Sequence, residues 1–145
     1  MKQCYVFDLD GTLADDSHRQ HFLTGEKKDW PAYYAGMGDD ILFRDVYKVC
    51  SRLSSHIIIL TGRPEEYRTL TERWLAHNCD NYYDMLIMRP TGDYSPSGPL
   101  KVKQLRELEE QGYEIMGIFE DRPEVADAMV LAGYTVFQVR RGNGR

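Results

Sequence analysis

Five short apolar runs recur along the chain, and stretches with helical spacing of apolar residues lie between most of them. The runs occupy residues 4–7, 56–60, 85–88, 115–119 and 135–139. Buried strands that alternate with amphipathic segments are typical of a parallel sheet with helical crossovers. The pattern predicts a three-layer α/β fold, in which helices cover both faces of a mostly parallel five-stranded sheet.

Four stretches predict the helices, at residues 41–53, 64–77, 100–111 and 123–131. The first should bury one stripe, formed by Ile41, Leu42, Val46, Val49 and Leu53. Pro64 precedes two glutamates, which suits a helix start because proline fixes φ and acids favour the helix N-terminus. Gly112 and Gly133 follow the last two stretches, where glycine commonly ends a helix.

Residues 15–40 do not fit this alternation and are too long for a simple connector. The segment carries charged and aromatic side chains: His18, Arg19, His21, Lys27, Lys28, Trp30, Tyr33 and Tyr34. It is either a loop with a short helix that covers the sheet edge or a lid over the end of the first strand. We favour the lid, because ligands of open α/β sheets bind beyond the carboxyl ends of the strands.

The composition is that of one globular domain over residues 1–145, with 42% hydrophobic and 28% charged residues. A net charge of −5 argues against a broad surface for duplex nucleic acid, although a single strand end could be held locally. Three cysteines without metal or redox spacing indicate reduced packing residues and a cytoplasmic location. No apolar run approaches the roughly 18 residues of a membrane span, so we expect neither a signal peptide nor an anchor.

Two carboxylates stand at the end of the first predicted strand, in the sequence DLDGT of residues 8–12. Residues i and i+2 of a strand face the same way, so Asp8 and Asp10 can meet one substrate. Gly11 lets the backbone turn sharply just beyond them. The alternative is an incidental acidic edge that faces solvent.

Polar residues also follow the second and fourth apolar runs. Thr61, Gly62 and Arg63 offer a hydroxyl, a close backbone approach and the start of a helix, which are the parts of an anion site. Their alternative role is a helix cap and turn. Glu120 and Asp121 form a second acidic pair, whose alternative role is to compensate the dipole of the following helix.

Two lysines in the third predicted helix compete for a place at these strand ends. Lys101 shares a helical face with the apolar side chains of Leu105 and Leu108, whereas Lys103 projects toward solvent. A lysine on a buried face needs an anionic partner to offset its desolvation, and the acidic strand ends supply one. The alternative is that Lys101 extends to solvent from the first turn of the helix.

Together these groups are typical of magnesium-dependent phosphoryl transfer. Asp8, Asp10 and Asp121 offer the oxygen ligands that Mg²⁺ prefers. Lys101, Thr61 and the helix-start amides can bind phosphoryl oxygens. Asp8 can attack phosphorus to form an aspartyl-phosphate, and Asp10 can protonate the leaving oxygen and later activate water.

The four groups, ordered from residue 8 to residue 121, resemble the motifs of the haloacid dehalogenase superfamily of phosphatases. The resemblance implies a Rossmann-like fold with a small lid after the first strand. A closer resemblance is to the 3′-phosphatase domain of phage-type polynucleotide kinase. That domain has an arginine eleven residues after its nucleophile, matched by Arg19, and one in its second motif, matched by Arg63. Its lysine stands nineteen residues before the acidic pair, the spacing of Lys101 to Glu120.

Two positions depart from this family. Glu120 stands where the family has an aspartate, so we assign metal binding to Asp121 and supporting roles to Glu120 and Arg122. The family's acidic residue four positions before the lysine is Ser97 here, and whether Asp93 replaces it stays open.

The resemblance implies a phosphomonoesterase that removes the 3′-phosphate from DNA, RNA or nucleotide ends. Arg19 and Arg63 would then hold the phosphate, and the aromatic residues of segment 15–40 would stack a base or pack the lid. The sequence has no P-loop, so any 5′-kinase activity must come from another chain. A separate kinase or a ligase is a candidate partner. The alternatives are a 5′-deoxynucleotidase and a non-catalytic module that binds nucleic-acid ends.

Overall fold

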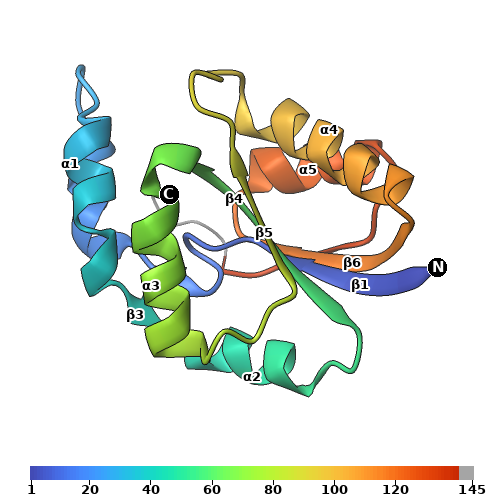
Figure 1. The fold of residues 1–145 in the computed structure, drawn as a ribbon. Coiled ribbons are helices and arrows are strands. Elements are labelled where there is room, and N and C mark those ends of the chain that lie inside the picture. The colour runs from blue at the N-terminus through green and yellow to red at the C-terminus, as the bar shows by residue number, and fades with distance from the viewer. Residues whose placement is uncertain (141–145) are drawn as a thin grey trace.

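A five-stranded parallel sheet forms the centre of the molecule (Figure 1). The computed structural model describes residues 1–140. The strand order is β5-β4-β1-β6-β7, and every pairing in this sheet is parallel. The strands are β1 (Lys2–Phe7), β4 (His56–Pro64), β5 (Met85–Arg89), β6 (Tyr113–Glu120) and β7 (Val136–Gln138). The expected α/β fold is confirmed, and the carboxyl ends of all five strands meet at one edge.

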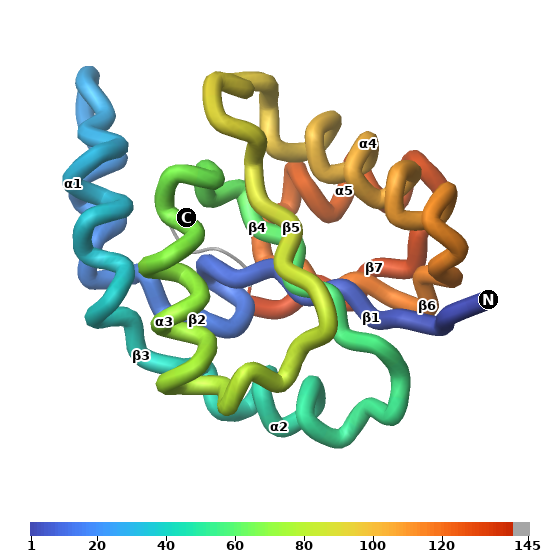
Figure 2. The backbone as a smooth tube through the Cα atoms, in the orientation of Figure 1, coloured from blue at the N-terminus to red at the C-terminus, as the bar shows by residue number. Residues whose placement is uncertain are grey.

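Helices cover both faces of the sheet, as Figures 1 and 2 show. Helices α2 (Arg44–Arg52) and α3 (Arg68–Cys79) lie on one face, and α4 (Ser97–Glu110) and α5 (Pro123–Leu131) lie on the other. Alternate side chains of a strand enter opposite cores. In β1, Phe7 packs into the core under α2 and α3, whereas Val6 packs into the core under α4 and α5.

Two helices begin later than the pattern predicts. Ile41–Leu42 form strand β3, which pairs antiparallel with β2 (Ala14–Asp15), and α2 starts only at Arg44. Ile41 and Val49 are exposed, so the apolar stripe expected for this helix was wrong at these two positions. The buried residues of α2 are Val46 and Cys50, which lie one helical turn apart. 

The second of these helices starts at Arg68 rather than at Pro64. Strand β4 continues through Pro64, whose pairing with Arg89 of β5 keeps the chain extended. A short 3-10 helix, η3 (Glu65–Tyr67), then leads into α3. The expectation that Thr61 and Gly62 stand beside the free backbone amides of a helix start was therefore wrong. Both residues lie inside strand β4.

Residues 15–40, which we call the lid segment, stand beside the sheet and are drawn in blue in Figure 2. The segment contains η1 (Ser17–Leu23), α1 (Trp30–Ala35) and η2 (Met37–Asp39). The β2–β3 ribbon joins its two ends, so the segment leaves the sheet and returns at one place. Tyr33 and Met37 are buried.

Cys4, Cys50 and Cys79 are buried and unpaired, as the sequence predicts. Within residues 1–140, none of the helices has the length and apolar character that a membrane span requires.

Candidate active site

Lys101 joins the acidic ends of two neighbouring strands. β1 and β6 pair with Phe7 opposite Phe119, so Asp8 and Glu120 emerge next to each other. Lys101 Nζ donates to Asp8 Oδ1 and to Glu120 Oε1, both at 2.8 Å. All three side chains are buried, whereas Lys103 is exposed. Burial alone would lower the pKa of Lys101, but the two carboxylates hold it above its ordinary value.

Glu120 also fixes the start of α5. Its Oε2 accepts the backbone N–H groups of Asp121 at 3.1 Å and Arg122 at 3.2 Å. The Arg122 side chain turns instead to Glu124 at the surface. Glu120 therefore orients Lys101 and the Asp121 backbone together, and the Arg122 guanidinium lies outside the buried group.

Asp8, Glu120 and Asp121 form a group of buried carboxylates with ligand oxygens within 4.8 Å of one another. Hard oxygen donors at this separation suit Mg²⁺. Both carboxylate oxygens of Glu120 bond Lys101 or backbone amides, which agrees with the supporting role expected for it beside Asp8 and Asp121. Burial and then the charge of Glu120 raise the pKa of Asp8 to about 6, against the opposing charge of Lys101. The Asp10 carboxylate, also expected at the metal, lies outside this group.

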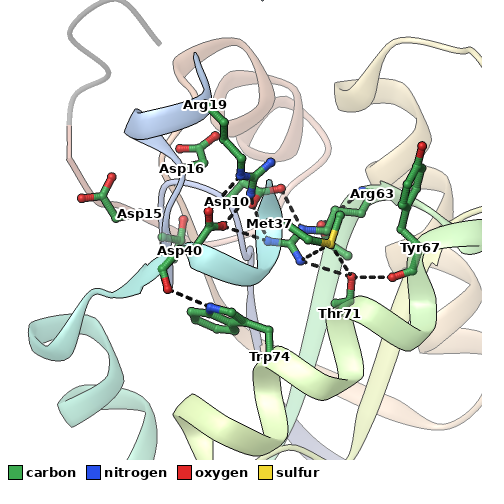
Figure 3. Close-up of polar contacts among 12 residues, drawn as sticks. Asp10, Asp15, Asp16, Arg19, Met37, Asp40, Arg63, Tyr67, Thr71 and Trp74 are labelled. Carbon is green, nitrogen blue, oxygen red and sulfur yellow. Dashed lines mark hydrogen bonds and ion pairs between the residues drawn. The ribbon is translucent and has the colours of Figure 1, made fainter. Parts of the chain in front are cut away.

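Asp10 is bound by two arginines that arrive from different parts of the chain (Figure 3). Arg63 of β4 donates to it through Nε at 3.1 Å and Nη2 at 2.7 Å, which is a bidentate contact. Arg19 of η1 donates through Nη2 at 2.7 Å. Burial favours the neutral acid, but these guanidinium groups outweigh it and hold the pKa of Asp10 below its usual range.

Asp40 completes this ion network from the end of the lid segment. It accepts from Arg19 Nε at 2.8 Å and Nη2 at 2.6 Å, and from Arg63 Nη2 at 3.3 Å. His18 Nε2 lies 2.7 Å from Asp40 Oδ1. Figure 3 shows Trp74, whose Nε1 donates to the Asp40 carbonyl at 2.9 Å. The network joins the lid segment to the sheet and to α3.

Sequence reasoning missed Asp40, as well as Met37 and Thr71, whose side chains accept from Arg63 Nη1 at 3.2 Å each. Nothing in the sequence separates Asp40 from its exposed neighbour Asp39. The guanidinium groups expected to hold phosphate are thus buried and bonded to protein carboxylates in this structure.

The remaining expected residues lie near the carboxylates bonded to Lys101 or near the arginines bonded to Asp10. Thr61 is buried, and its Oγ1 accepts the N–H of Arg63 at 3.2 Å. Thr12 Oγ1 donates to Asp8 Oδ2 at 3.2 Å. A Cβ placed on Gly62 would lie 3.7 Å from Ser97 Oγ and 3.8 Å from Arg89 Nη2, so Ser97 stands beside the second motif. Asp93 does not, because its carboxylate bonds Ser95 in an exposed loop.

Several solved structures with this fold are described as a phosphatase, as hydrolases or as members of the haloacid dehalogenase family. The class C acid phosphatase from Bacillus anthracis with tungstate bound is 16% identical, with a TM-score of 0.68 over 97% of this chain and 67% of that chain. An enzyme of the haloacid dehalogenase family from Bacteroides thetaiotaomicron, in complex with magnesium and inorganic phosphate, is 10% identical, with a TM-score of 0.58 over 99% and 96%. The fold is that of the haloacid dehalogenase class.

Two structures of a Pnkp1/Rnl/Hen1 complex, one described as an RNA repair complex, are more similar in sequence. Their matching chains are 30% and 31% identical over 99% of this chain, with TM-scores of 0.78 and 0.75. The family model of the polynucleotide kinase PNKP phosphatase domain matches residues 2–143. The chain belongs to this family and is a phosphatase. It spans 44% and 47% of the two matching chains, and no curated protein matches it.

Proposed function

We propose that this phosphatase removes the 3′-phosphate from nucleic-acid or nucleotide ends, with Mg²⁺ as cofactor and an aspartyl-phosphate on Asp8. The family match over residues 2–143 supports the substrate class. The observation that carries the chemistry is the buried Asp8 carboxylate, bonded at 2.8 Å to Lys101 and grouped with Asp121.

The residues of this chain perform two steps. In the first, a carboxylate oxygen of Asp8 bonds to phosphorus as the bond from phosphorus to the 3′ oxygen breaks, and Asp10 gives that oxygen its proton. In the second, Asp10 takes a proton from the water that attacks phosphorus, which frees Asp8 and releases inorganic phosphate. A divalent cation held by Asp8 and Asp121 would offset the charge of the phosphoryl oxygens.

Lys101 holds the attacking carboxylate in place, since one ammonium bonds Asp8 and Glu120 together. Arg19 and Arg63 hold Asp10, two residues after Asp8, by donating hydrogen bonds to its carboxylate. Transfer of one of these guanidinium groups to the phosphoryl oxygens would release Asp10 for proton transfer to the leaving oxygen. That movement would give the arginines the phosphate-binding role expected from the sequence.

A substrate panel tests the proposal. Phosphate release is measured with Mg²⁺ on one oligonucleotide that carries phosphate at its 3′ end or at its 5′ end, and on 5′-mononucleotides. We expect the 3′-phosphorylated form to have the highest kcat/KM. A preference for 5′-mononucleotides would instead support the deoxynucleotidase alternative.

The complexes with Rnl and Hen1 that contain similar chains support a separate ligase partner for the product.

A further inference from the structure

His18 lies at the outer end of the ion network around Asp40, and the proposed chemistry does not use it. Its Nε2 is 2.7 Å from Asp40 Oδ1, and its side chain is 43% exposed while that of Asp40 is fully buried. An ionised carboxylate only accepts hydrogen bonds, so Nε2 carries the proton in this contact. Arg19 and Arg63, which also bond this carboxylate, are buried. His18 therefore connects the network to the surface of the molecule.

The two oxygens of Asp40 divide its partners. Oδ1 accepts from His18 Nε2 and from Arg19 Nε at 2.8 Å, and Oδ2 accepts from Arg19 Nη2 at 2.6 Å. Arg19 thus makes a bidentate contact, which needs both carboxylate oxygens near the plane of the guanidinium group. The bond from His18 holds Oδ1 in that position.

Arg19 passes this orientation on to Asp10. The Nη2 atom that bonds Asp40 also donates to Asp10 Oδ1 at 2.7 Å, and Nη1 donates to the carbonyl of Tyr33 at 3.1 Å. The Tyr33 ring lies against the same guanidinium group, 4.2 Å from its carbon. Each guanidinium nitrogen of Arg19 is therefore bonded, and the place of the group depends on the place of Asp40.

Asp40 restrains Arg19 more closely than it restrains Arg63. Its bonds to Arg19 measure 2.6 and 2.8 Å, whereas its bond to Arg63 Nη2 measures 3.3 Å. Burial raises the pKa of Asp40, and the hydrogen bonds from Arg19 and His18 oppose that rise. His18 therefore favours both the orientation and the charge with which Asp40 holds Arg19.

We propose that His18 is a positioning residue for proton transfer by Asp10. It acts through the contacts of Asp40 and Arg19, and the inference rests on the role of Asp10 in the proposed function. Without the bond from His18, the Asp40 carboxylate can turn, and Arg19 loses the bidentate contact that fixes it. Proton transfer to the leaving oxygen then suffers, whereas attack by Asp8 changes little, because Asp8 belongs to the other group of carboxylates.

The dependence on the leaving group separates a role in proton transfer from a general effect on the fold. p-Nitrophenolate is a weak base and leaves without a proton, whereas phenolate is a stronger base whose departure an acid assists. We compare kcat/KM on phenyl phosphate and on p-nitrophenyl phosphate for the wild type, D10N, H18N and H18Q. Glutamine in H18Q carries an amide N–H about as far as Nε2 of histidine, and the shorter asparagine in H18N does not. H21N is the matched control, since His21 is an exposed histidine of the same 3-10 helix.

We expect H18N to lose about tenfold in kcat/KM on phenyl phosphate, the loss that corresponds to one hydrogen bond to a charged group, and less than about threefold on p-nitrophenyl phosphate. H18Q should keep most of the activity on both compounds, and H21N should match the wild type. D10N should show the same selectivity more strongly, because general acid catalysis contributes ~10²–10⁴-fold. His18 is partly exposed, so these variants should fold, which thermal unfolding verifies.

Three results would overturn the inference while D10N stays selective as expected. One is wild-type kcat/KM on both compounds in H18N, and another is an equal loss on both compounds in H18N. A third is an equal selective loss in H18N and H18Q, which would show that the hydrogen bond to Asp40 is not the cause. An equal loss on both compounds in D10N would instead overturn the role of Asp10 in the proposed function, so the two failures are distinguishable.

Discussion

At the scale of single residues, one ammonium group holds the carboxylate of Asp8, the proposed nucleophile, in place. Lys101 bonds Asp8 and Glu120 at the same distance, and both acceptors are buried. Without this cation, two carboxylates would remain close together in a site largely closed to water. The lysine therefore serves both the stability and the chemistry of the protein.

K101M should lose most of its activity and destabilise the fold, because removing one partner of a buried ion pair costs about 3–5 kcal/mol. K103M is the matched control, since Lys103 lies on the exposed face of the same helix. Urea unfolding and phosphate release on p-nitrophenyl phosphate measure the two effects. Loss of activity in K103M with K101M active would contradict the placement of Lys101.

The three cysteines give a second test at this scale, through their thiol pKa. Burial raises the pKa of Cys4 to about 11, that of Cys50 to about 12 and that of Cys79 to about 12. A raised pKa means less of the reactive thiolate at pH 8. We expect no thiol to react with a disulfide reagent in the native protein, and all three to react in urea. A native thiol that reacts at the unfolded rate would contradict this burial.

At the scale of elements, the strands could be predicted because each contains a short run of apolar residues. Helix α5 could be predicted because its buried residues follow helical spacing. The sequence also separated Lys101 from Lys103, since that choice depends only on one helical face. β3 could not be predicted, because Ile41 and Leu42 continue the apolar spacing of α2 while pairing with β2.

Asp40 could not be predicted from the sequence for a related reason. The role of Asp40 depends on the return of the lid segment to the sheet, which brings it to Arg19 and Arg63. Contacts between distant segments leave no periodic pattern.

The Asp40 carboxylate forms an ion pair with Arg63 of β4 and so joins the lid segment to the sheet; D40N should therefore loosen the segment. The amide leaves Arg19 and Arg63 without one of their carboxylate partners. Amide hydrogen exchange should speed up within residues 15–40 and stay slow in the sheet, and kcat/KM should fall at least tenfold. D39N is the matched control, because Asp39 is exposed. Uniform exchange rates in D40N and D39N would show that the network does not anchor the lid segment.

At the scale of the whole molecule, cation binding should stabilise the fold. A ligand at a hundred times its dissociation constant adds about 2.7 kcal/mol to the free energy of unfolding. Millimolar Mg²⁺ should therefore raise the Tm of the wild type by several degrees. D121N should lose this rise, and D127N, a change on the exposed face of α5, should keep it. The same rise in D121N as in the wild type would place the cation elsewhere.

The sheet edge brings these parts together in one molecule. Asp8 and Asp10 follow the end of β1, Thr61 and Arg63 lie in β4, and Glu120 ends β6. Because these strands are adjacent and parallel, residues far apart in sequence form one site. The acid groups divide into one set held by Lys101 and another held by arginines. The proposed function builds on that division, with attack on phosphorus by Asp8 and proton transfer by Asp10.

D8N tests this assignment most directly, because asparagine keeps the shape of Asp8 and cannot act as the nucleophile. Phosphate release from a 3′-phosphorylated oligonucleotide is measured with Mg²⁺ for the wild type and for D8N, with circular dichroism to verify the fold of each. We predict that folded D8N releases no phosphate above background while the wild type turns over. Release by folded D8N at a rate near that of the wild type would contradict the role of Asp8.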